Sequence, residues 1–281
     1  MLRTFPHLHF FQAAPVPEGA SAAAEREAAL ANPHYRALRA VLFMYAKLNP
    51  GVGYVQGMNE LLGPIYYVFA TDPRVEWRSH AEADAFFCFT QLMSEVMNNF
   101  IKTLDHSAVG VKGHMATLNR LLRTKDPQLW AHLEHLKIDP QFYSFRWLTL
   151  LLSQEFELPD VLRLWDTLLA DAQRFSHLHY VCIAMMIAVR DTLLAADFAT
   201  ALRLLQAYPP SSMDSLLELA RQVAQPAFRA SHEEEGEEED GDDHSGEGRR
   251  RRGRQQRVDE VVEVRADDGD DGGSGFSAFF G

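Results

Sequence analysis

Apolar residues in this chain recur at spacings of three and four over long stretches, and this periodicity constrains the fold more than any other feature. Between residues 81 and 104 one such stripe is formed by Phe86, Phe89, Met93, Val96, Phe100 and Leu104. Similar stripes run through residues 35–48, 111–122 and 213–223. This spacing places side chains on one face of an α-helix, whereas a half-buried strand alternates with a period of two. We therefore predict an all-α protein.

Prolines mark where several of these helices begin. Asp126 and Asp139 each precede a proline, so each can cap a helix whose first position needs no N–H group. The pair Leu158 and Pro159 indicates a further start. Residues 145–152 are apolar on nearly every face and could form a buried strand, but the length from Pro140 to Glu155 favours a buried helix.

The composition separates a helical domain from its flanks. With 47% hydrophobic residues, the 281-residue chain can form a sizeable core. We predict one domain within residues 1–225, interrupted by a low-complexity loop at residues 13–31 that is rich in Ala and Glu. Residues 226–281 contain an acidic run, a basic run and an Asp/Gly/Ser-rich end, which cannot bury enough apolar surface to fold. We predict that they form a disordered tail.

Charge and cysteine usage exclude several classes of protein. The net charge of −12 argues against a nucleic-acid binder, and no apolar stretch approaches the ~20 residues of a transmembrane helix. Cys88 and Cys182 both lie in apolar runs, which is typical of free thiols in a reducing compartment. We therefore predict a cytoplasmic protein without a transmembrane segment.

No motif indicates a cofactor or metal held by the chain itself. Gly51, Gly53 and Gly57 resemble a dinucleotide-binding loop, but the third glycine is one position late and the preceding segment is predicted to be helical. The histidine pairs at positions 7 and 9, 132 and 135, and 177 and 179 have no companion ligand at metal-binding spacing. A P-loop and a Gly-x-Ser-x-Gly elbow are both absent from the sequence.

Two motifs indicate a family. Residues 54–60 read YVQGMNE, which resembles the YxQGMN motif of the TBC domain, the helical GTPase-activating module that acts on Rab-family small GTPases. A second region contains RW at 146–147, EF at 155–156 and LWD at 164–166, similar to the RW…EF…LWD signature of the same family. The resemblance implies a multi-helix TBC domain that here lacks its first helices.

The resemblance also implies a mechanism with two catalytic residues. In the family, an arginine from an IxxDxxRT motif and the glutamine of YxQG act on the GTP of the partner. Carried over, the catalytic residues are Arg3 and Gln56, while Tyr54, Gly57 and Asn59 contact the GTPase or support the motif. An amide can accept from water and donate to phosphate, and a guanidinium donates two bonds to phosphate oxygens.

The implied partner is a Rab-family GTPase in vesicle trafficking and intracellular protein transport. GTP and Mg²⁺ would arrive with that GTPase, and association with endomembranes would be peripheral and through it. The chain would activate hydrolysis without having GTPase activity of its own.

Arg3 is the point where the sequence departs from the family pattern. It lies in the run Arg3-Thr4-Phe5-Pro6, similar to R-T-x-P, but the isoleucine and aspartate that should precede it would fall before Met1. An alternative is therefore a Rab-binding or scaffolding module that has little or no activating function.

Three charged residues lie among the apolar residues of the second motif region. Arg146, Glu155 and Asp166 are predicted to form structural ion pairs, because charges in an apolar setting are rarely left unpaired. We expect this network to support the helices behind the Gln56 loop rather than to take part in the chemistry.

Overall fold

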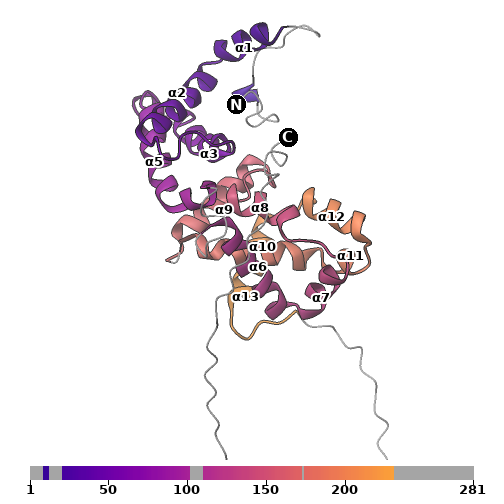
Figure 1. Cartoon of the computed structure of the whole chain (residues 1–281). Coiled ribbons are helices and arrows are strands. Elements are labelled where there is room, and N and C mark those ends of the chain that lie inside the picture. Colours follow the sequence, from indigo (N-terminus) through magenta and orange to yellow (C-terminus); the bar gives the residue numbers. More distant parts are fainter. Residues whose placement is uncertain (1–8, 13–20, 102–109, 173, 231–281) are drawn as a thin grey trace, which may run out of the picture. The chain divides into compact units, whose positions relative to one another are not determined.

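The computed structural model describes residues 9–12, 21–101, 110–172 and 174–230. The chain divides into a unit of residues 1–231 and a second of residues 232–281, and the predicted disorder of the tail lies outside the described residues. Every regular element among the described residues is a helix, which confirms the all-α prediction (Figure 1).

The first half of the fold consists of the helices described up to residue 101. In chain order they are η1 (His9–Phe11), α1 (Ala22–Ala31), α2 (Pro33–Leu48), α3 (Met58–Ala70), α4 (Val75–Arg78), α5 (Ala81–Val96) and η2 (Met97–Phe100). Helix α3 packs against α2 and α5 through buried residues that include Leu61, Leu62 and Phe89.

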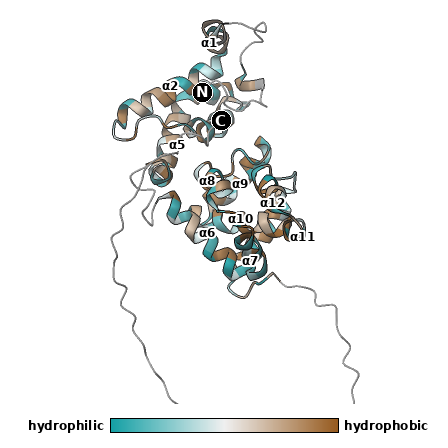
Figure 2. Cartoon of the chain, turned by 45° about the vertical axis from the view of Figure 1, so that its right-hand side comes forward, coloured by the Kyte–Doolittle hydropathy of each residue, from teal (hydrophilic) through white to brown (hydrophobic). Residues whose placement is uncertain are grey.

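The remaining helices surround a central one. In order they are α6 (Val111–Lys125), α7 (Pro127–His135), α8 (Gln141–Thr149), α9 (Leu158–Ala170), η4 (Arg174–Ser176), α10 (His177–Ala188), α11 (Arg190–Leu194), α12 (Phe198–Gln206) and α13 (Met213–Ala224). Helix α10 is buried over most of its length and contacts α13, α6 and α8. Figure 2 shows that α6, in contrast, carries both hydrophilic and hydrophobic residues along its length, as an amphipathic helix does.

Capping explains several helix starts. Asn32 accepts backbone N–H bonds from His34 and Tyr35 at 2.8 and 3.3 Å, so that α2 begins at Pro33. Asp126 accepts from the N–H of Leu129 at 2.9 Å, which confirms the predicted start of α7. At α8 the prediction was one residue early, because Pro140 and not Asp139 occupies the cap position.

Two of the predicted helix and loop boundaries are wrong. The predicted loop at residues 13–31 includes α1, which Ser21 caps by accepting from the Ala24 N–H. The predicted helix to residue 155 ends at Thr149, after which Leu151 and Leu152 adopt φ of 50° and 60°.

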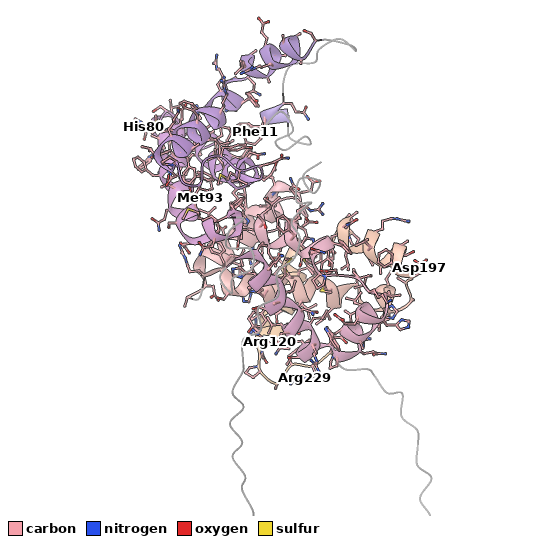
Figure 3. All side chains as sticks on the ribbon, in the orientation of Figure 1. Phe11, His80, Met93, Arg120, Asp197 and Arg229 are labelled. Atoms are coloured by element: carbon pink, nitrogen blue, oxygen red, sulfur yellow. The ribbon has the colours of Figure 1, made fainter. Side chains whose placement is uncertain are left out.

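The domain also extends past residue 225. The Ala230 N–H donates to the carbonyl oxygen of Lys125 at 2.9 Å, and the Lys125 ammonium donates to the carbonyl oxygen of Gln225 at 2.5 Å. The side chain of Arg229, labelled in Figure 3, donates to the carbonyl oxygens of Pro226 and Phe228. The Ala230 bond joins the residues after α13 to the end of α6, whereas the bonds of Arg229 stay within residues 226–229, so contacts with the domain continue to residue 230.

Candidate functional site

The loop between α2 and α3 forms a tight turn with Gln56 at its tip. The Met58 N–H donates to the Val55 carbonyl oxygen at 3.2 Å, and the Val55 N–H donates to the Met58 sulfur at 3.4 Å. Gly57 has φ 102° and ψ −25°, close to the third position of a type II turn, where glycine avoids the strain of a Cβ atom. The glycine that follows Gln56 is therefore required by the turn.

The turn leaves Gln56 exposed while the residues that follow it are buried. Gly57, Met58, Asn59 and Glu60 are all buried at the start of α3. Tyr54 is partly exposed. The loop thus presents the amide of Gln56 at the surface from a backbone that the protein interior holds.

Asn59 connects the two sides of this turn. Its Oδ1 atom accepts from the Tyr54 hydroxyl at 3.1 Å and from the Gly57 N–H at 3.2 Å. Its Nδ2 atom donates to Oε1 of Glu60 at 2.7 Å. Tyr54, Gly57 and Asn59 are therefore brought together at the turn that carries Gln56.

Burial raises the pKa of two side chains in this cluster. It raises the pKa of Tyr54 to about 12, with a further contribution from the nearby Glu60, so the hydroxyl stays a neutral donor. Burial also raises the pKa of Glu60 to about 7, although hydrogen bonds from Asn59 and Gln154 oppose the shift.

Glu60 and Gln154 were not among the predicted site residues. Glu60 was part of the quoted motif, and the signal that could have singled it out is a carboxylate in the first turn of an apolar helix. Gln154 has no comparable signal, because it lies 94 positions from Glu60 in the chain.

Arg146 and Glu155 form an ion pair. Arg146 donates from Nε to Oε1 at 2.6 Å and from Nη2 to Oε2 at 2.8 Å, and Nη2 also donates to the Gln206 carbonyl oxygen at 2.6 Å. The Glu155 side chain is 2% exposed and that of Arg146 is 35% exposed. Burial raises the pKa of Glu155, and the bonds from Arg146 counteract that rise.

Asp166 is not part of this network, and the prediction of its internal position is wrong. It lies on the exposed face of α9, and within the described part of the chain no ion pair includes it. The neighbouring Trp165 is the buried residue of the LWD motif, and its Nε1 donates to the Leu151 carbonyl oxygen at 3.0 Å. This bond satisfies a backbone group at the left-handed turn after α8.

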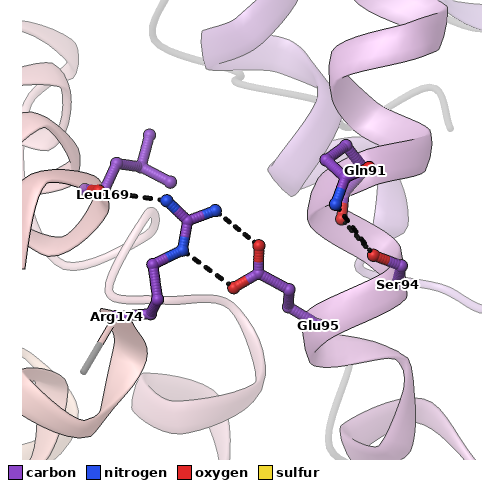
Figure 4. Close-up of polar contacts among 5 residues, drawn as sticks. All are labelled: Gln91, Ser94, Glu95, Leu169 and Arg174. Carbon is purple, nitrogen blue, oxygen red and sulfur yellow. Dashed lines mark hydrogen bonds and ion pairs between the residues drawn. The ribbon is translucent and has the colours of Figure 1, made fainter. Parts of the chain in front are cut away.

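A second bidentate pair connects α5 to the segment that follows α9. Arg174 donates to both carboxylate oxygens of Glu95 and, through Nη1, to the Leu169 carbonyl oxygen (Figure 4). Arg174 itself has φ 53°. The pair lowers the pKa of Glu95.

Arg3, the second predicted catalytic residue, lies outside the described residues. Over the ranges that the structure describes, no group of three or more His, Cys, Asp or Glu side chains is placed to hold a metal. Within those same ranges, none of the helices has the length and apolar character needed to span a bilayer.

The fold and the motif geometry agree with the family comparison. The Rab-GTPase-TBC domain model matches residues 24–194, which include the Gln56 loop, the Arg146–Glu155 pair and Trp165. The chain belongs to the Rab-GTPase-TBC domain family.

Individual relatives can then be named. The chain is 54% identical to TBC1 domain family member 13 of Mus musculus over 190 residues, which are 68% of this chain and 48% of that protein. It is 32% identical to the GTPase-activating protein gyp1 of Schizosaccharomyces pombe over 190 residues, covering 62% and 36% of the two chains. The chain thus spans about half the length of the mouse protein and about a third of the yeast protein.

A solved structure shares the fold. The crystal structure of the Ypt/Rab-GAP domain of Gyp1p matches with a TM-score of 0.60 and 27% sequence identity, over 67% of this chain and 64% of that one.

Proposed function

We propose that this protein is a GTPase-activating protein for a Rab-family GTPase, and that Gln56 orients the attacking water. The observation that carries the proposal is the exposed glutamine at the tip of a turn held by Gly57 and Asn59, in a chain of the Rab-GTPase-TBC domain family. GTP hydrolysis needs a water in line with the γ-phosphate, and an amide can accept from that water while it donates to phosphate.

Arg3 is proposed as the second catalytic residue. Negative charge develops on phosphate oxygens during hydrolysis, and a guanidinium supplied by a partner raises the rate by about 10³–10⁵. GTP and Mg²⁺ are proposed to be carried by the GTPase. Cytoplasmic location, and peripheral association with endomembranes through the GTPase, follow from the same proposal.

The test is single-turnover phosphate release from a panel of GTP-loaded Rab GTPases. On a responsive GTPase, Gln56→Ala is expected to lower the stimulated rate by about tenfold or more, because a methyl group cannot orient water. The variant should melt like the wild type, since Gln56 is exposed. Equal rates for the two proteins would remove Gln56 from the mechanism.

A matched control variant and a binding measurement complete the test. Gln12→Ala changes the same side chain at a partly buried position outside the loop and is expected to leave the rate unchanged. Binding of GTP-loaded Rab by the wild type without any stimulated release would instead favour the binding or scaffolding module.

A further inference from the structure

Glu60 is a carboxyl group in a place where a carboxylate is costly. Its residue is 5% exposed, and its neighbours on α3, Leu61 and Leu62, are fully buried. Burying an ionisable group costs free energy unless hydrogen bonds compensate for lost water. The contacts of Glu60 therefore indicate its role.

The contacts of Glu60 determine the orientation of the Asn59 amide. An asparagine side chain can present either its oxygen or its NH₂ group to a given neighbour. Here Oδ1 faces two donors, the Tyr54 hydroxyl and the Gly57 N–H, while Nδ2 faces Oε1 of Glu60. An ionised carboxylate only accepts, so it requires the NH₂ group on its side and leaves Oδ1 for the two donors.

The amide orientation reaches the backbone of Gln56. The Gly57 N–H belongs to the peptide group that joins Gln56 to Gly57, and its hydrogen bond to Asn59 fixes the plane of that group. A rotated Asn59 amide would present NH₂ to the Gly57 N–H and to the Tyr54 hydroxyl. The turn would then lose the bond to the Gly57 N–H that helps hold it in place.

Glu60 also connects the loop to the second motif region. The Gln154 side chain lies close enough to Glu60 to lower the pKa of its carboxyl group, and the adjacent Glu155 is fixed by Arg146. The two sequence motifs therefore meet at the Glu60 carboxyl group, with the Gln56 turn on one side and the segment after α8 on the other.

We propose that Glu60 is a positioning residue for Gln56, acting through the Asn59 amide and the Gly57 N–H. This inference rests on the proposed function of Gln56. Glu60 itself is buried, and its proposed action is only through these neighbouring groups. Its contribution is expected in the rate of the chemical step rather than in affinity for the GTPase.

Titration of Glu60 provides a specific readout. Burial raises its pKa to about 7, so the acceptor-only carboxylate predominates above neutral pH and the neutral acid below it. Among the described residues it faces Tyr54 from the preceding loop, the neutral amide of Asn59 and the neutral amide of Gln154. The stimulated rate is therefore expected to rise with pH through about 7.

The experiment compares three variants on a responsive Rab GTPase. Glu60→Met removes the acceptor but keeps an apolar side chain of similar length, and is expected to lower kcat about fivefold or more while KM stays within about twofold. Glu60→Gln, which like the neutral acid both accepts and donates, is expected to give a flat profile between about pH 6 and pH 8, with kcat above that of Glu60→Met and near the low-pH value of the wild type. Glu76→Gln, the same change on the exposed α4, is the control and should keep the wild-type profile.

A second measurement does not depend on activity. Amide hydrogen exchange of residues 54–60 in the free protein is expected to be faster by about tenfold or more in Glu60→Met, with wild-type exchange in α10. If the wild type stimulates no GTPase, the proposed function fails, and exchange alone decides whether Glu60 holds the turn.

Three results would overturn the inference. Wild-type exchange at Gly57 together with wild-type kcat in Glu60→Met would show that the turn does not need Glu60. A raised KM at constant kcat would assign Glu60 to GTPase docking. Should Glu60→Met fail to fold, retention of the wild-type pH profile by Glu60→Gln would contradict the role of Glu60.

Discussion

At the scale of residues, some charged side chains are buried in ion pairs and others are exposed. Glu155 and Asp126 are buried and paired with Arg146 and Arg190 at 2.6 and 2.7 Å, respectively. Asp166, by contrast, is exposed on α9 although the apolar Leu164 and Trp165 precede it. Burial of a charge therefore follows from how the surrounding segments pack and not from the residues beside it in sequence.

Arg146→Ala is expected to damage folding before it damages catalysis. The change leaves Glu155 buried without its counter-charge and the Gln206 carbonyl oxygen without its donor. Breaking a fully buried pair costs about 3–5 kcal/mol, and the partial exposure of Arg146 reduces the expected cost to about 2 kcal/mol. Urea unfolding beside activity per folded molecule would measure both effects.

Arg163→Ala is the matched control for that measurement. Arg163 pairs with Asp214 at 3.3 Å, but both side chains are largely exposed, so its loss should change stability by about 0.5 kcal/mol or less. If Arg146→Ala melted like this control and still lost activity, Arg146 would have to be assigned to the GTPase-contacting surface.

At the scale of elements, the junction of loop and helix before α3 depends on backbone conformation. Gly57 combines the third position of a turn with the cap of α3, and it has no side chain to satisfy the first N–H groups of the helix. Its carbonyl oxygen accepts from the N–H groups of Glu60 and Leu61. One glycine therefore fixes both the start of the helix and the exposure of Gln56.

Gly57→Ala is expected to lower the unfolding free energy by about 1–2 kcal/mol, because φ near 100° strains a residue with a Cβ atom. The stimulated rate should fall as well, since the strain falls on the peptide group next to Gln56. Thermal melts and phosphate release would measure the two effects.

Gly51→Ala provides the comparison within the same loop. A Cβ atom at Gly51 would meet nothing within 4 Å, so this variant should match the wild type or be slightly more stable. Equal losses in both variants would mean that the loop is sensitive to any change and not to the positive φ of Gly57.

At the scale of the whole molecule, helices far apart in sequence are joined by a few buried polar contacts. His114 on α6 and His179 on α10 have stacked rings, with Nδ1 and Nε2 3.3 Å apart. Burial lowers the pKa of both, and for His179 the neighbouring His114 lowers it further. The interior therefore favours the neutral forms of the pair.

This pair is expected to make the fold sensitive to acid. Below the ordinary histidine pKa of about 6.5 the unfolded chain takes up protons that the folded protein resists, so stability falls as pH drops. Between about pH 7.5 and pH 5.5, the urea concentration at the midpoint of unfolding should fall less in His179→Gln than in the wild type. Glu60 titrates with the opposite sign, but its contribution is the same in wild type and variant and cancels in the comparison.

His135→Gln changes an exposed position on α7 and serves as the control. Its urea midpoint should fall on acidification by as much as that of the wild type. An unchanged pH dependence in His179→Gln would show that the contact between α6 and α10 does not sense protonation.

The sequence by itself determined the helical class, the motifs and many helix starts. The apolar periodicity, the prolines at 127 and 159 and the cap at Asp126 all act within a few residues, so they can be read from the chain alone. The YVQGMNE run identified the loop that carries Gln56, and its glycine is explained by a local turn.

Only the tertiary structure decided which polar groups meet. Asp126 is a cap that sequence can predict, but its pairing with Arg190 joins positions 64 residues apart. The proximity of Gln154 to Glu60, and the exposure of Asp166, likewise depend on how the helices pack. Local signals act over one or two turns of chain, whereas the burial that makes an ion pair or a raised pKa matter is created by segments that are distant in sequence.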